Sequence, residues 1–178
     1  PYIGLFYLFA CGLQYLKDQK RFHPVLFLVI ITVFPVLLGS QSIDQQRKWK
    51  NGETLWTSAI QTYPNAYFPY LCRGRYFKQK DQLNLAFNDF QKSVQFHPNA
   101  EAYYELGLLY EAREDFENAL DRYLKATQGT TPYPKAHLNA AKIFGMKGDG
   151  DKAKHHFERA IEIDPQYSLA YFNYAVLL

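Results

Sequence analysis

Residues 86–98, AFNDFQKSVQFHP, carry the spacing that decides the fold. A small residue is followed four positions later by an aromatic one, three later by another small one, and five later by proline. The spacing recurs over 119–132, where proline comes one position late, and over 153–165, so the copies start 33 and 34 residues apart. A period of this length predicts stacked supersecondary units, none of which buries its apolar face alone.

A second pattern places a small residue twelve positions upstream of each copy, between two aromatic residues. It reads Tyr70, Gly74, Phe77, then Tyr103, Gly107, Tyr110, then His137, Ala141, Phe144, and it begins again at Tyr171 and Ala175. Small residues let two antiparallel helices approach closely, aromatic rings fill the gaps beside them, and proline ends the second helix. The spacing closely resembles the tetratricopeptide repeat, which implies an α-solenoid of paired helices.

This register divides the chain. We expect repeats at about 65–98, 99–132 and 133–166 and a partial one at 167–178. Gly52, Trp56, Ala59 and Pro64 follow the spacing of a second helix, so residues 44–64 are predicted to be a degenerate half-repeat, docked without a flexible linker. Apolar residues near Leu178 leave the last unit without a polar cap, so we expect further repeats in the complete protein.

The N-terminal stretch is apolar. Phe22 to Ile43 are 22 residues without a charge, long enough to span a bilayer as a helix, and residues 1–16 form a second uncharged run. With the charged loop at 17–21 between them, residues 1–43 are predicted to be two transmembrane helices, the first truncated. A buried hairpin in a soluble repeat protein is the main alternative, and a signal peptide is disfavoured because the charged loop precedes the longer run. The predicted fold class is all-α, a transmembrane helical hairpin followed by a tetratricopeptide-repeat α-solenoid.

Charge is unevenly placed. From Asn65 onward fourteen Lys or Arg balance fourteen Asp or Glu, so the net charge of +3 comes from residues beside the apolar runs. A nucleic-acid-binding domain would carry its basic excess on the folded repeats, so no nucleic-acid partner is predicted. The basic residues that flank the apolar runs favour membrane lipid as a partner of residues 1–43. They do not fix the orientation of the predicted helices in the membrane. Cys11 and Cys72 form no predicted disulfide framework.

No catalytic, cofactor or metal site is predicted. His155 and His156 are adjacent and point about 100° apart on a helix, so we interpret them as solvated rather than as a metal pair. His137 occupies an aromatic position of its repeat and is interpreted as a packing histidine. Gly148 to Asp151 lack the ligand spacing of a calcium or phosphate loop and are interpreted as the turn between two helices.

A binding surface remains. The first helices of such pairs line the concave face, and we expect a protein or peptide ligand there. Asn139 and Asn173 share one repeat position, and their amides can pair with the backbone of an extended peptide, although surface polarity without a ligand is the favoured explanation because only two of the four repeats carry Asn there. The predicted peptide-binding residues are Leu71, Arg75, Lys78, Tyr104, Glu105, Leu108, Leu138, Asn139, Lys142, Phe172 and Asn173.

The order of parts resembles a larger family. Two spans, a Trp-containing helix (residues 49–64) and tetratricopeptide repeats are similar to the C-terminal part of transmembrane-and-tetratricopeptide-repeat proteins and their bacterial relatives. That resemblance implies a multi-span, glycosyltransferase-like membrane domain upstream, which uses lipid-linked sugars, with the repeats on the periplasmic or lumenal side presenting acceptor proteins. No residue here matches the family's catalytic acidic residue. A membrane-tethered scaffold for complex assembly without enzymatic activity is the alternative, so whether the protein is an enzyme stays open.

Overall fold

The computed structural model describes residues 50–129 and 132–177, together with Tyr7, Ala10, Cys11, Gln14, Tyr15 and Val33. The chain divides into two compact units, Pro1–Lys50 and Asn51–Leu178, and the fold below is that of the second. The transmembrane hairpin predicted for 1–43 lies almost wholly outside the described residues. Within them, no helix is both long and apolar enough to cross a bilayer.

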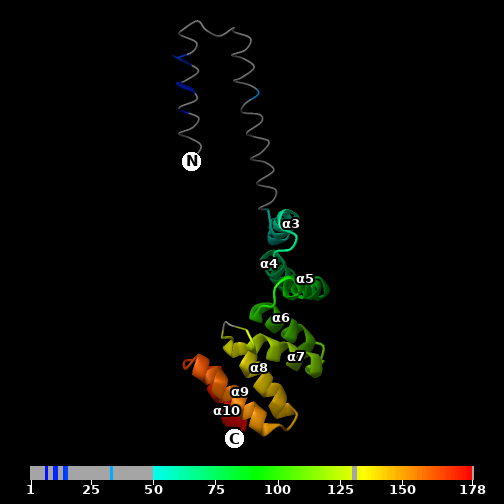
Figure 1. The fold of residues 1–178 in the computed structure, drawn as a ribbon, viewed down its shortest axis with the longest axis vertical. Coiled ribbons are helices and arrows are strands. Elements are labelled where there is room, and N and C mark those ends of the chain that lie inside the picture. Colours follow the sequence, from blue (N-terminus) through cyan, green and yellow to red (C-terminus); the bar gives the residue numbers. More distant parts are fainter. Residues whose placement is uncertain are drawn as a thin grey trace. The chain divides into compact units, whose positions relative to one another are not determined.

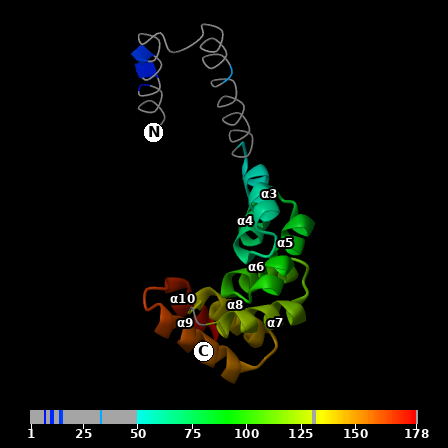
Figure 2. The same ribbon diagram turned by 45° about the horizontal axis from the view of Figure 1, so that its top comes forward.

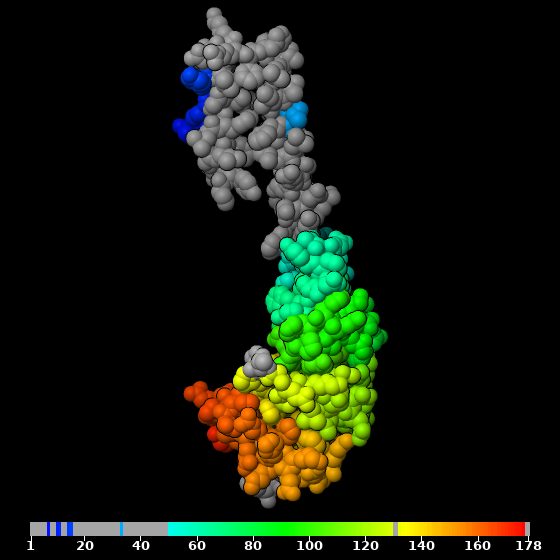
Figure 3. All heavy atoms as spheres, viewed as in Figure 1, coloured from blue at the N-terminus to red at the C-terminus, as the bar shows by residue number. Residues whose placement is uncertain are grey.

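The second unit is a stack of α-helices, with no strand among its described residues. Helices pack in the pairs α4–α5, α6–α7 and α8–α9, and each pair contacts the next in chain order (Figures 1 and 2). Figure 3 shows the same order as a continuous solid stack. The helices are α3 (Gly52–Thr62), α4 (Tyr67–Gln79), α5 (Leu83–Phe96), α6 (Ala100–Glu111), α7 (Phe116–Thr127), α8 (Pro134–Met146), α9 (Gly150–Ile163) and α10 (Ser168–Leu177).

The predicted contact between small and aromatic residues holds each pair together. A Cβ added at Gly74 would lie 2.7 Å from the ring of Phe90, and one added at Gly107 would lie 2.4 Å from the ring of Tyr123. Phe90 and Tyr123 are fully buried. Glycine is therefore required at these two positions for the helices to reach this separation.

The turns between paired helices share one backbone conformation. Asp81, Glu114 and Gly148 all have positive φ, at 58°, 59° and 76°, and they occupy the same repeat position. Asp149 then caps α9 by accepting a hydrogen bond from the Lys152 amide at 3.2 Å. The prediction of a turn is confirmed for Gly148 and Asp149, because the left-handed residue reverses the chain and the aspartate caps the next helix, whereas Gly150 and Asp151 already belong to α9.

The helix α3 packs on α4 as the second helix of a half-repeat would. Arg73 of α4 connects three helices, since its guanidinium donates to both carboxylate oxygens of Asp89 in α5 at 2.7 and 2.8 Å and to the Thr57 hydroxyl of α3 at 3.0 Å. The Asp89 side chain is only 5% exposed. The half-repeat is thus joined to the first full repeat through a buried ion pair.

Candidate peptide-binding face

Four helices carry the predicted ligand-binding residues. Three are the first helices of the pairs, α4, α6 and α8, and the fourth, α10, occupies the equivalent place in the partial repeat. Leu71 and Leu138 are each only 2% exposed, so the prediction that they line an open surface was wrong. Leu71 packs in a core cluster with α6, and Leu138 packs in a cluster with Ala170 of α10. Their register position is covered by the following first helix of the stack.

Phe172 is the opposite case, because no following helix in the described part of the chain covers it. It stands one repeat after Leu138 in the register, yet it is 67% exposed. Among the described residues no helix follows α10 to cover it. The equivalent Tyr104 is half-buried, with its ring 5.1 Å from that of Tyr133 and 5.8 Å from that of Tyr123. At Leu71, Tyr104 and Leu138 this register position therefore serves packing between repeats, whereas at Phe172 it is open.

The predicted charges of the first two repeats do come together, but they pair with one another. Lys78 lies 2.7 Å from a carboxylate oxygen of Glu105, and Arg75 lies 3.8 Å from the other. Arg75 also bonds Glu101 at the start of α6. A charged ligand would have to compete with these contacts, so this part of the face offers a partner little uncompensated charge.

A polar network occupies the floor between the second and third repeats. The Tyr123 hydroxyl donates to Glu111 at 2.5 Å, and Asn139 hydrogen-bonds the hydroxyls of Tyr104 and Tyr123. Burial is the largest cause that raises the pKa of Tyr104 to about 12, and burial and the bond to Glu111 also raise the pKa of Tyr123. Asn139 is 9% exposed, so its amide is engaged inside the protein rather than free for a peptide.

The remaining predicted residues lie at the surface. Leu108 is half-exposed and Lys142 is exposed, with its ammonium 3.9 Å from Glu111. Asn173 is half-exposed and its amide donates to the Leu169 carbonyl at 2.7 Å. Neither asparagine therefore offers a free side-chain amide to the backbone of a ligand. Asn139 is buried, and the Asn173 amide bonds the backbone of its own helix.

Sequence reasoning missed one row of surface residues, of which three are exposed and Glu101 is half-exposed. It lies three residues before Leu71, Tyr104, Leu138 and Phe172, and therefore on the same side of each helix. Its apolar members Phe68 and Leu169 are 51% and 49% exposed. The repeat register could have found them, because the positions are again 33 or 34 residues apart. The row consists of Phe68, Glu101, Lys135 and Leu169.

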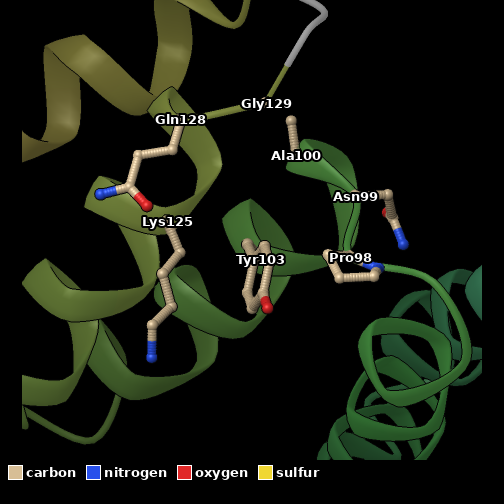
Figure 4. A pocket seen from close by; sticks show the side chains of 7 residues that line it. All are labelled: Pro98, Asn99, Ala100, Tyr103, Lys125, Gln128 and Gly129. Carbon is tan, nitrogen blue, oxygen red and sulfur yellow. The ribbon is translucent and has the colours of Figure 1, made fainter.

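A shallow pocket of about 350 Å³ lies at the edge of the second repeat. In Figure 4 the Tyr103 ring stands between the residues that lead into α6, on one side, and Lys125 of α7 and its C-cap residue Gln128, on the other. Lys125 is held by Asp121 at 2.9 Å. The pocket offers an aromatic surface with polar neighbours to a small side chain. Its lining is Pro98, Asn99, Ala100, Tyr103, Lys125, Gln128 and Gly129.

The arrangement of the histidines agrees only partly with the prediction. His155 is exposed, but His156 is half-buried and its Nδ1 lies 3.0 Å from Nδ1 of His137, so the interpretation of His156 as solvated was wrong. His137 is buried at 8% exposure, in keeping with a packing histidine. In the described part of the chain no three His, Cys, Asp or Glu side chains are grouped to hold a metal ion.

Comparison with known families agrees with this geometry. Residues 96–166 and 156–178 match two tetratricopeptide-repeat models. The helical stack is a tetratricopeptide-repeat α-solenoid. The human Tetratricopeptide repeat protein 6 is 24% identical to this chain over 160 residues, 90% of the chain, and the aligned part spans 31% of that relative.

Solved tetratricopeptide-repeat structures superimpose on the array. MamA does so with a TM-score of 0.62 at 24% identity, covering 75% of this chain and 81% of MamA. YrrB, described as a TPR protein with an unusual peptide-binding site, gives 0.63 at 21%, covering 69% of this chain and 64% of YrrB. The second TPR domain of human RPAP3, solved with an HSP70 peptide, gives 0.53 at 19%, covering 59% of this chain and 88% of that domain. At these identities the likeness establishes the fold.

Proposed function

We propose that this tetratricopeptide-repeat module binds an extended segment of a partner protein along the first helices of its repeats. Two structural neighbours support a peptide ligand, since YrrB has a peptide-binding site and the RPAP3 domain was solved with a bound peptide. The observation that carries the proposal is the exposed surface on α8 and α10. There Lys135 and Lys142 of α8 and Leu169 and Phe172 of α10 are all exposed.

The two halves of the face differ in what they offer. Arg75 and Lys78 pair with glutamates of α6, whereas the contact of Lys142 with Glu111 is longer, at 3.9 Å. A surface with both exposed apolar side chains and cations suits a partner segment with both apolar and polar residues. Binding is therefore centred on α8 and α10.

The test is affinity for peptides selected from a display library on the whole chain. Lys142→Ala and Phe172→Ala should each weaken the selected peptides by roughly tenfold, the cost of about 1.4 kcal/mol for a contributing interface residue. The matched control is Lys154→Ala on α9, an exposed lysine outside the face, whose pairing with Glu158 at 3.9 Å is equally weak. Equal affinity of all three variants would contradict the proposed face.

We further propose that residues 1–43 tether the module to a membrane, with the repeats on the extracytoplasmic side. The uncharged run from Phe22 to Ile43 supports the tether, and the family resemblance supports the side. Met146, 67% exposed, is a suitable position for a single labelling cysteine in a chain lacking Cys11 and Cys72. Labelling by an impermeant thiol reagent in intact bacterial cells is expected for periplasmic repeats, and labelling there only after permeabilisation would place the repeats in the cytoplasm.

The resemblance also supports a role for the module in presenting acceptor proteins to a glycosyltransferase-like membrane domain. The alternative is a membrane-tethered scaffold without enzymatic activity. Deleting the repeats from the complete protein distinguishes the two. Loss of glycosylation on proteins that bind the α8–α10 surface is the expected result, and unchanged glycosylation with loss of a complex would favour the scaffold.

A further inference from the structure

The third repeat contains an imidazole pair at the contact between its two helices. His137 of α8 and His156 of α9 meet through their Nδ1 atoms at 3.0 Å. One ring must donate and the other accept, so the pair is complete when both rings are neutral. The His156 ring also stacks on Phe144, with centroids 5.4 Å apart and planes 21° apart, which fixes its orientation.

The surroundings disfavour added positive charge. Arg159 and His155, both on α9, act on His137, and among the described residues no carboxylate hydrogen-bonds to either ring. Carboxylates of the packed elements are engaged elsewhere. On α7, Asp121 pairs with Lys125 and Glu117 with Lys147, and Glu158 of α9 accepts from the Tyr174 hydroxyl of α10.

Protonation acts in two steps. A first proton keeps the Nδ1 hydrogen bond, but it places a cation in a largely buried site near Arg159. A second proton puts an N–H on both facing atoms and removes the acceptor. Each step weakens the contact between α8 and α9, while the unfolded chain takes up the same protons in water without this cost.

We propose that the His137–His156 pair is an acid-sensitive contact that keeps the third repeat closed at neutral pH and lets it open at mildly acidic pH. Helix α10 packs on α8 and α9, with Ala170 and Tyr174 in the same core cluster as Leu138 and Phe157. Opening therefore exposes α10 as well, whereas the first repeat, which is held by the Arg73–Asp89 pair, stays closed.

The pH window follows from linkage. Burial, with the charge of His156 second, lowers the pKa of His137 from 6.5 to about 4, so the unfolded chain binds more protons between these values. Stability of the repeat is therefore complete above about pH 6.5 and falls as pH decreases toward about 4. For one such ring the opening equilibrium changes by at most about thirtyfold between about pH 7.5 and about pH 5. Burial also lowers the pKa of His156, in the same direction.

The experiment is native-state hydrogen exchange on the whole chain at both pH values, corrected for intrinsic exchange rates. Amides of α8, α9 and α10 should lose on the order of tenfold protection at the lower pH, while those of α4 and α5 should not. His137→Tyr, which copies Tyr70 and Tyr103 at the same register position, should abolish most of this loss. His155→Gln on the exposed neighbour is the matched control and should retain it.

NMR titration of the unmodified protein keeps the proposal testable if His137→Tyr does not fold. Two of the five histidine rings should titrate below the ordinary value of about 6.5, and both should report the opening of α8–α9. Ordinary titration of all rings, or an equal acid-induced loss of protection in all repeats, would overturn the proposal. Binding of a peptide is not required in either measurement, so the outcome is independent of the proposed ligand face.

Discussion

Replacing Asp89 by alanine tests how the half-repeat is joined to the array. The Asp89 carboxylate is 5% exposed and accepts two hydrogen bonds from Arg73, whose side chain is 18% exposed. After Asp89→Ala, Arg73 retains the Thr57 hydroxyl at 3.0 Å and the rings of Tyr70 and Phe77, with centroids at 5.9 and 5.6 Å. The guanidinium then has no paired carboxylate, and only the charge of Glu53, the smallest of the influences on Arg73, still favours it in a site that is mostly shielded from water.

Removing one partner of a buried pair costs about 3–5 kcal/mol. The remaining exposure of Arg73 and its bond to Thr57 place this case at the lower end, about 3 kcal/mol. In the double variant Arg73→Leu/Asp89→Ala the stranded charge is gone, and leucine is the residue of the second repeat at this position, Leu106, which is 1% exposed. The double variant should therefore be more stable than Asp89→Ala by at least about 1 kcal/mol.

Urea unfolding followed by far-UV circular dichroism measures these differences, with Lys154→Ala as the control at an exposed pair. That control removes a contact of 3.9 Å between side chains more than half exposed and should cost less than about 0.5 kcal/mol. A loss for Asp89→Ala equal to that of the control would refute the reasoning. So would a double variant whose loss equals the sum of the two single losses, because it would mean that the side chains act independently.

Two further predictions concern the second repeat. Gly107→Ala should lower the free energy of unfolding by about 1–2 kcal/mol, because overpacking against Tyr123 outweighs the gain in helix propensity; Gly150→Ala, whose added Cβ meets nothing within 4 Å, should be neutral or stabilising in the same urea experiment. The pKa values of Tyr104 and Tyr133 are raised to about 12, chiefly by burial, so stability present below about pH 10 should fall as pH rises toward 12. Absorbance of tyrosinate during alkaline unfolding checks this, and ionisation of these rings near pH 10 in the folded protein would contradict it.

The stacked helices could be predicted from the sequence because their signal is local and repeated. Gly74 and Phe90, sixteen residues apart, return as Gly107 and Tyr123, and such a pair specifies both helices and their close approach. The repeat period also places the left-handed turns, of which Gly148 is one. These features depend on contacts within one repeat, so the spacing contains them.

The binding face was predicted less well because its exposure depends on contacts between repeats. Leu71 and Leu138 lie on the predicted helices, but the next first helix covers them. The Asn139 side chain hydrogen-bonds Tyr104 and Tyr123, a buried contact that its interpretation as a polar surface residue does not predict.

The histidines show a similar limit. The 100° between adjacent helical residues was used to exclude a metal pair formed by His155 and His156. The same angle directs one ring to solvent and the other toward α8, so it also allows a buried contact. The partner, His137, is nineteen residues away, and only the packing of α8 on α9 identifies it.

The three repeats differ in the residue that they carry at one register position. Asp89 of the first repeat corresponds to Arg122 in the second and to His156 in the third. The first repeat is joined by an ion pair that persists through neutral pH, whereas the third depends on neutral imidazoles. Because neighbouring repeats in a solenoid support one another, acid should open the array from the third repeat and α10, while the half-repeat and the first repeat remain folded. The surface centred on α8 and α10 is then the part of the proposed ligand face that acid removes first.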